Sequence, residues 1–210
     1  ESDDCYSAPM VSTVNSAASR TLATLATQPR ISTLNLQFSS GWHETSDFEK
    51  GRFEKSWGPA SWSDAILQGP HLHVSTPLYK QPNESMKHNL DWTSTDLEAL
   101  SPSAQPVTQY KPAGDRATYD HLYTHWDNVS STNFYRVAWR QMAANTGERT
   151  LIPTIIPPGP TYVFTIHSAA TSVRNTPILA ASASSLLADF MIRSSPKAHI
   201  LPPSFSRIPT

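Results

Sequence analysis

The alternation of apolar and polar residues between positions 134 and 142 predicts a β-strand. The stretch reads FYRVAWRQM, and in an extended chain successive side chains point to opposite faces. One face would carry Tyr135, Val137 and Trp139, which we expect to anchor the strand to the core. The opposite face would carry Arg136 and Arg140. We expect this face to be open to solvent, with the two arginines acting together.

Two more strands and a helix are predicted after this stretch. RTLIPTIIPP, residues 149–158, is apolar and β-branched, but Pro153 has no N–H to donate to a ladder. This strand should therefore lie at a sheet edge or a bulge, and TYVFTIHSA, residues 161–169, predicts the next strand. Residues 174–196 predict a single helix, because Pro177 fits a first turn and apolar residues then recur at helical spacing.

The first half of the chain has weaker periodicity. ISTLNLQF, residues 31–38, alternates as a strand does, and HLHVS predicts a strand with His71, His73 and Ser75 on one face. Residues 79–115 are poor in apolar residues and predict a long irregular connection, of a length that is usually functional or mobile. Because strands and helices are mixed without a βαβ rhythm, the sequence predicts the α+β class: a mixed sheet with flanking helices and long irregular loops.

Composition limits the cellular compartments and the kinds of binding site that we expect for this protein. Among 210 residues Cys5 is the only cysteine, which excludes a disulfide framework and a multi-cysteine zinc site and favours a reducing, cytoplasmic location. No apolar run approaches the roughly 20 residues that a membrane-spanning helix needs, so we expect no membrane contact. The sequence begins without a methionine, and we expect it to be a fragment of a longer protein.

Charge is distributed unevenly between the two halves. The net charge is −1, but residues 111–210 hold nine lysines and arginines against five aspartates and glutamates. Seven of these nine cations are arginines, the side chain best suited to bidentate recognition of phosphate and guanine. The asymmetry is a hint of nucleic-acid contact in the second half.

Motifs of catalysis are missing from the sequence. It contains no Gly-x-Ser-x-Gly elbow, no phosphate-binding glycine loop and no Gly-x-Gly cofactor loop. PPGPTY, residues 157–162, lacks the Asn of the Asn-Pro-Pro-aromatic tetrapeptide of amino-methyltransferases. His71 and His73 supply two ligands without a third at motif spacing, so no metal site is expected. The chain offers binding residues and no recognisable catalyst.

Three stretches together resemble a known family. They are LQGPHLHVSTPLYKQPN, YRVAWRQMAANTGERTLIPTIIPPGPTY, and SLLADFMIRSSPKAHI ahead of LPPSFSRIP. They are similar to the C-terminal target-recognition region of large single-chain adenine-specific DNA methyltransferases, including type IIG restriction-modification enzymes and related phage-defence methylases. The similarity spans roughly residues 60 to 209. Its most specific part is the Arg-containing strand followed by Asn-x-x-x-Arg-Thr and a Pro-rich apolar strand.

The resemblance implies a DNA target-recognition domain over residues 60–210, preceded by an N-terminal segment, residues 1–59, that connects to a catalytic domain. S-adenosylmethionine would bind that separate methyltransferase domain, so no cofactor, metal or catalytic residue is expected in this chain. Duplex DNA and the catalytic domain would be its partners. The residues expected to contact DNA are Arg136, Arg140, Asn145, Arg149, Lys80, Lys87, Arg174 and Arg193.

Three alternatives remain open from the residues alone. Six tryptophans and seven tyrosines could stack on sugar rings in a carbohydrate-binding module. The same aromatic residues could instead serve a protein-binding module. A third alternative is a self-contained hydrolase that uses an unrecognised set of Ser, His and Asp residues. For the arginines, the structural alternatives are that Arg149 pairs with Glu148 or Asp127 and that Arg193 stabilises the C-terminal end of the last helix.

Overall fold

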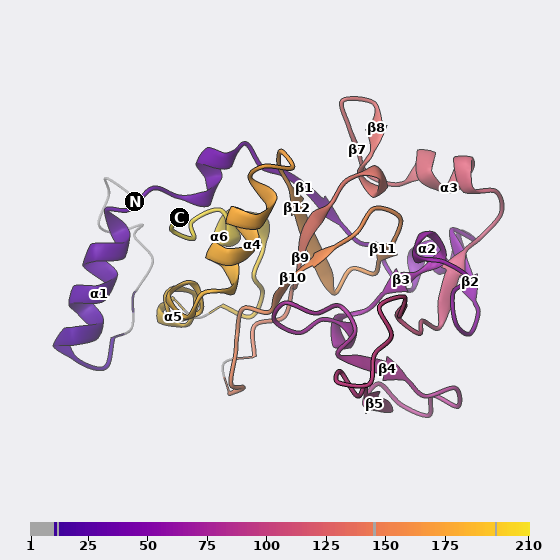
Figure 1. Cartoon of the computed structure of the whole chain (residues 1–210), viewed down its shortest axis with the longest axis horizontal. Helices are drawn as coiled ribbons and strands as arrows, with labels where there is room; N and C mark the ends of the chain where they lie inside the picture. The colour runs from indigo at the N-terminus through magenta and orange to yellow at the C-terminus, as the bar shows by residue number, and fades with distance from the viewer. Residues whose placement is uncertain (1–10, 12, 145, 196) are drawn as a thin grey trace.

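The computed structural model describes residue 11 and residues 13–144, 146–195 and 197–210 (Figure 1). Its centre is a four-stranded antiparallel sheet in the order β1-β12-β9-β10. The strands are β1 (Gln37–Ser40), β9 (Arg136–Arg140), β10 (Pro153–Ile156) and β12 (Ile166–Ala170). Pro153 begins an edge strand, as the sequence predicts. The mixture of this sheet, smaller sheets, helices and loops confirms the α+β class.

Short helices from the C-terminal part cover one face of this sheet (Figure 1). They are α4 (Thr176–Ser184), α5 (Leu186–Ser194) and α6 (Pro202–Phe205). The indole of Trp139 stacks on the ring of Phe205, with ring centroids 3.8 Å apart and planes 4° from parallel. Its Nε1 donates to the carbonyl oxygen of Ile200, 2.8 Å away. Trp139 and Val137 are fully buried, so the predicted anchoring by these two residues is confirmed.

The helix predicted over residues 174–196 is in fact two helices. Ser185 has extended backbone angles, φ −66° and ψ 151°, and separates α4 from α5. Its hydroxyl oxygen accepts a hydrogen bond from the backbone N–H of Ala188, 3.0 Å away, and so caps α5. Serine competes for backbone hydrogen bonds in this way, which explains why an apolar periodicity that continues across residue 185 did not reveal the break.

The other face of the sheet packs against a layer built from short strands and 3-10 turns. β3 (Ile66–Leu67) pairs in parallel with β11 (Thr161–Tyr162) directly beneath β9 and β10. The remaining elements are β2 (Phe53–Lys55) with β6 (Tyr110–Pro112), β4 (Lys80–Pro82) with β5 (Trp92–Ser94), β7 (His125–Trp126) with β8 (Val129–Ser130), α2 (Ser46–Glu49), α3 (Arg116–Leu122), η2 (Trp62–Asp64), η3 (Gly69–His71) and η4 (Ser131–Asn133).

The predicted strand with His71, His73 and Ser75 on one face is wrong. His71 ends the 3-10 turn η3 and is fully buried, whereas His73 is half-buried and forms an isolated bridge with Thr76. Pro70 lies within the turn, and Ser75 has a positive φ of 66°, which no regular strand contains. The two histidines therefore face different surroundings.

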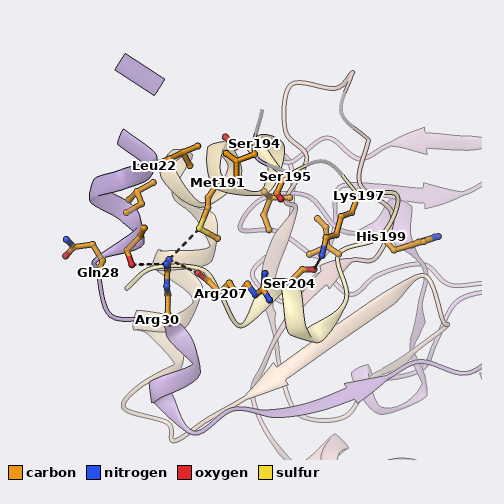
Figure 2. Close-up of a pocket in the computed structure, with 15 residues that line it drawn as sticks. Leu22, Gln28, Arg30, Met191, Ser194, Ser195, Lys197, His199, Ser204 and Arg207 are labelled. Carbon is orange, nitrogen blue, oxygen red and sulfur yellow. Dashed lines mark hydrogen bonds between the residues drawn. The ribbon is translucent and has the colours of Figure 1, made fainter. Parts of the chain in front are cut away.

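Helix α1 (Ser16–Ala26) and η1 (Ile31–Leu34) lie beside the C-terminal helices (Figures 1 and 2). Arg30 holds this arrangement: its guanidinium donates to the carbonyl oxygens of Ala26 and Arg207, at 3.1 and 3.0 Å. The backbone N–H of Ile31 donates to the carbonyl of Ile208 at 2.8 Å, and that of Thr210 donates to Pro29 at 2.9 Å. The segment over residues 29–31 is thus bonded to residues 207–210.

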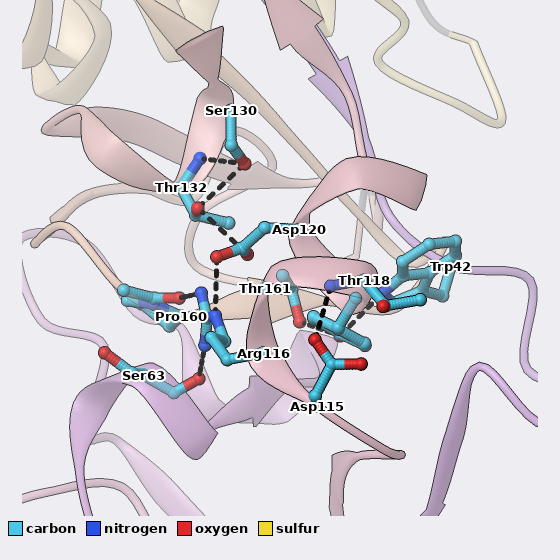
Figure 3. A network of polar contacts seen from close by, with 12 residues as sticks. Trp42, Ser63, Asp115, Arg116, Thr118, Asp120, Ser130, Thr132, Pro160 and Thr161 are labelled. Carbon is cyan, nitrogen blue, oxygen red and sulfur yellow. Dashed lines mark hydrogen bonds and ion pairs between the residues drawn. The ribbon is translucent and has the colours of Figure 1, made fainter.

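A polar network ties α3 to the layer beneath the sheet (Figure 3). Arg116 forms an ion pair with Asp120, Nε to Oδ2 2.7 Å, and also donates to the carbonyl oxygens of Ser63 and Gly159. Gly159 has φ 113°, and a Cβ there would lie 3.0 to 3.1 Å from Ser63. Only glycine therefore suits this crossing of two chain segments.

Residues 31–55 pack into the same core as the rest of the chain. Ile31 belongs to the cluster that contains Trp139, and Trp42 and Phe53 share another cluster with Ile66. Strand β1 also pairs with β12 in the central sheet. Described residues on both sides of position 59 therefore contribute to the same clusters, and the boundary between residues 59 and 60 stays a prediction. Among the helices of the described residues, none has the length and apolar character needed to cross a membrane.

Candidate nucleic-acid interface

A pocket of about 390 Å³ lies where β9 ends, beside the first part of the long connection over residues 79–115. Side chains from four segments line it, and they bring together three of the cations predicted to contact DNA: Lys80, Arg140 and Arg149. The other lining residues are Pro70, His73, Tyr79, Asn89, Leu90, Trp92, Ala144, Gly147, Glu148 and Ile152. The pocket combines positive charge with aromatic walls and has one carboxylate at its edge.

Arg140 reaches the pocket from the last position of β9. Its Nη2 donates to the carbonyl oxygen of Leu72, which fixes the guanidinium, while its Nε has no hydrogen-bond partner in the described structure. Burial lowers the pKa of Arg140 below its usual value. The side chain remains a cation at neutral pH, and its remaining N–H groups are suited to an anionic acceptor.

Arg149 enters the pocket from the loop that follows β9, but its guanidinium is largely engaged. Nη2 donates to the carbonyl oxygens of Ser184 and Ser185, at 2.8 and 3.3 Å, and Nε lies 3.6 Å from Oδ1 of Asp189. The alternative that Arg149 pairs with Glu148 or Asp127 is therefore wrong, because Asp189 is its acidic partner. Arg149 contributes charge to the pocket while it caps α4.

Asp189 fixes the same loop from α5. It is 5% exposed, and its Oδ1 accepts hydrogen bonds from the backbone N–H groups of Thr150 and Leu151, at 2.8 and 2.7 Å. Its Oδ2 lies 2.9 Å from Nε of Arg193, whose Nη2 donates to the carbonyl oxygen of Gly147 at 2.6 Å. Arg193, in the last turn of its helix, thus holds the pocket wall from behind. The DNA contact predicted for it has no support in this geometry.

Lys80, Tyr79 and His73 form the opposite wall. The ammonium of Lys80 lies 5.5 Å from the centroid of the Tyr79 ring, and the rings of Tyr79 and His73 are 4.4 Å apart. The pKa of His73 is lowered, first by burial and then by the positive charge of Arg140, with smaller contributions from Arg149 and Lys80 that Glu148 opposes. The charge of Arg140 thus adds to the effect of burial on the pKa of His73.

Trp92 is held in the pocket by a buried histidine. His71 packs edge-on against Trp92, with ring centroids 4.9 Å apart and planes at 90°. Its Nε2 donates to the carbonyl oxygen of Val107 at 2.7 Å, and its Nδ1 accepts from the backbone N–H of Gln68 at 2.9 Å. Burial lowers the pKa of His71 to about 4, so the ring is neutral at physiological pH.

The solvent exposure expected for Arg136 is wrong. Arg136 is 0% exposed; its Nη2 donates to the carbonyl oxygen of Pro160 at 2.5 Å, and its guanidinium lies 5.7 Å from the Tyr162 ring centroid. The alternation along β9 is as predicted, but the layer that contains Leu72 and Tyr162 covers the face expected to be open. Tyr135 lies before β9 and is 52% exposed, so its predicted anchoring role is also wrong.

The remaining predicted residues are dispersed. Asn145 lies outside the described residues. Lys87 is exposed in the loop between β4 and β5, two residues from the pocket residue Asn89, and Arg174 is exposed just before α4. Of the eight candidates, the structure therefore brings Lys80, Arg140 and Arg149 into one pocket, and it places Arg193 directly behind that pocket.

Sequence reasoning missed the aromatic half of the pocket. Tyr79 and Trp92 both lie in the connection over residues 79–115, which was identified only by its length and its lack of apolar residues. The aromatic residues within this polar stretch were a usable signal, because a connection too polar to build a core has little structural need for Trp92. Among the described residues, no three His, Cys, Asp or Glu side chains form a group able to hold a metal ion.

Comparison with known proteins adds no assignment: no family model matches the chain, and no curated protein matches its sequence.

Proposed function

We propose that the chain is a DNA-recognition domain of the kind found in large adenine-specific DNA methyltransferases, which positions duplex DNA for a separate catalytic domain. The observation that carries the proposal is the convergence of Lys80, Arg140 and Arg149 on one pocket with aromatic walls. These cations come from segments about 60 residues apart in sequence, and all three lie in the stretches that resemble the family.

The chemistry of the pocket suits one nucleotide of a DNA strand. Lys80 and Arg140 provide cations for a backbone phosphate, which is the group that dominates affinity for DNA. Trp92 and Tyr79 provide ring faces and edges for a sugar or base. Asn89 and Glu148 provide polar groups that can discriminate between bases. We assign Arg136 no contact with DNA, since the core encloses it.

Binding of a fluorescent DNA duplex, followed by anisotropy at several salt concentrations, tests the proposal. The dissociation constant should lie in the range of non-specific binding, roughly 10 to 100 μM at physiological salt, because the catalytic domain that completes the grip on the duplex is separate. Lys80→Ala and Arg140→Ala should each weaken binding and flatten the salt slope by about one unit. Lys50→Ala, at an exposed position in the C-terminal turn of α2, is the matched control and should change neither.

The same titration separates DNA binding from carbohydrate binding. Three of the six tryptophans, Trp42, Trp126 and Trp139, are buried in the interior, so the aromatic content is largely used by packing. Salt-independent binding of an oligosaccharide with no binding of DNA would contradict the proposal. If both Lys80→Ala and Arg140→Ala kept the wild-type salt slope, this pocket would be excluded as the DNA-binding site.

A further inference from the structure

A second and larger hollow lies on the side of the molecule opposite to β4 and β5. It is an apolar groove of about 670 Å³ between α1 and the C-terminal helices (Figure 2). Its floor consists of Leu22, Leu25, Met191, Ile192 and Ile200. The groove is distinct from the basic pocket, and none of its lining residues takes part in the DNA contacts proposed above.

Three cations surround this apolar floor: Arg30 follows α1, Lys197 follows α5 and Arg207 follows α6 (Figure 2). Among the described residues that line the groove, none is Asp or Glu. Arg30 donates to the carbonyl oxygens of Ala26 and Arg207 and contacts the sulfur of Met191, all of which are neutral. Within the described part of the chain, Lys197 donates to the hydroxyl of Ser204, 3.4 Å away.

The cations are therefore not neutralised within the part of the chain that the structure describes. The ion pairs there use other cations: Lys50, Lys111, Arg116, Arg149 and Arg193. An apolar groove with a positive rim is complementary to a ligand with an apolar face and negative flanks. Three cations on three separate segments match several carboxylates better than the single carboxylate of a fatty acid.

The groove also has the length that a helix needs. Helix α1 spans 11 residues, about 16 Å, and contributes Leu22, Leu25 and Ala26 along one side. On α5, Leu187 lies four residues before Met191 and is 51% exposed, so the apolar track continues one turn beyond the groove. A surface of this form accepts the apolar stripe of an amphipathic helix.

We propose that this groove binds an acidic amphipathic helix of a partner protein, with the apolar stripe on Leu22, Leu25 and Met191 and the carboxylates on Lys197 and Arg207. The proposal does not depend on DNA binding. Arg30 contributes charge but also clamps α1 to Arg207. It is therefore unsuitable for testing the charge contribution by substitution.

A labelled probe peptide tests the proposal. The probe is a helix of roughly 15 residues with Leu at the i, i+3, i+4 and i+7 positions and Glu on both flanks; the comparison peptide has Lys in place of every Glu. The acidic probe should bind the whole chain at least about tenfold more tightly than the basic one at low salt. The double variant Lys197→Glu/Arg207→Glu should lose at least about tenfold in affinity for the acidic probe and gain affinity for the basic one.

The control for net charge is Lys50→Glu/Lys55→Glu, which makes the same change at exposed positions near α2 and β2, far from α1 (Figure 1). It should leave the preference for the acidic probe intact. Equal affinity for both probes, or the same loss in both double variants, would overturn the proposal. So would displacement of the probe by dodecanoate at stoichiometric concentration, which would make the groove a fatty-acid site. Dimerisation that the probe disrupts would make its occupant a second copy of this chain and would also overturn it.

Discussion

Oδ1 of Asp189, in α5, accepts a hydrogen bond from the backbone N–H of Thr150, 2.8 Å away in the loop that carries Arg149. The same oxygen accepts from Leu151, and the other carboxylate oxygen pairs with Arg193. One buried carboxylate therefore joins a helix of the C-terminal part to one wall of the basic pocket.

Asp189→Asn should lower the free energy of unfolding by roughly 2–4 kcal/mol, because buried hydrogen bonds to a charged acceptor are strong and the ion pair with Arg193 is broken. Urea denaturation measures this change. Asp120→Asn is the matched control: its ion pair with Arg116 is more exposed, and it should cost about 1 kcal/mol. Equal losses in the two variants would show that Asp189 does not organise the loop.

Arg136 should stabilise the fold through the volume of its side chain more than through its charge. Arg136→Met keeps much of the volume and removes two buried N–H groups that have no partner, so its free energy of unfolding should stay within about 1 kcal/mol of wild type. Arg136→Ala leaves a cavity and should cost roughly 2–4 kcal/mol. A large loss in Arg136→Met, as measured by thermal melting, would mean that the guanidinium itself is required.

The stability of the protein should decrease as the pH falls from 6.5 to 4. In the folded state burial lowers the pKa of His71 to about 4, whereas in the unfolded state it is near 6.5. Between these values the unfolded chain binds a proton that the folded chain excludes, so acid favours unfolding by up to roughly 3 kcal/mol in total. Above pH 6.5 the ring is neutral in both states and this contribution is fully present.

Urea titrations at pH 7, 6 and 5 measure this dependence. His71→Gln should be less stable than wild type at pH 7 but should show a shallower loss between pH 7 and 5. The exposed His88 gives the control His88→Gln, which should retain the wild-type slope. The same slope in all three proteins would contradict the assignment.

Trp139→Ala should cost roughly 3–5 kcal/mol, because a fully buried indole is removed from its stack on Phe205. Trp139→Phe should cost less, roughly 1–3 kcal/mol, since it can keep the ring stack but leaves the carbonyl of Ile200 without its indole donor. Thermal unfolding followed by calorimetry measures both. A Trp139→Phe variant as unstable as Trp139→Ala would show that the hydrogen bond dominates.

The sequence predicted the strands around Trp139 and Pro153 because alternation and the missing proline donor are local properties. It could not predict that the face carrying Arg136 is covered, because Leu72 and Tyr162 reach that face from elsewhere in the chain. Periodicity shows which side chains share a face but not whether another layer lies upon it.

The candidate site, too, was predicted only as far as local patterns allow. Arg140 and Arg149 were identified from residue type and from the stretches that resemble the methyltransferase family. Their separate roles depend on partners distant in sequence, since Leu72 fixes Arg140 and Asp189 engages Arg149. Trp92 was missed because its position in the pocket comes from packing on His71, a contact that no local pattern indicates.

The pairing of β1 with β12, together with the bonds from Pro29 and Ile31 to Thr210 and Ile208, constrains synthesis on the ribosome. Strand β1 cannot pair in the central sheet until its neighbour β12 has been synthesised, about 130 residues later. Until then β1 and the apolar side of α1 have no native surface to cover them, and contacts so distant in sequence form slowly. The nascent chain therefore remains open to chaperones and proteases until residues 166–210 have emerged, and a product that stopped before them would lack these core contacts.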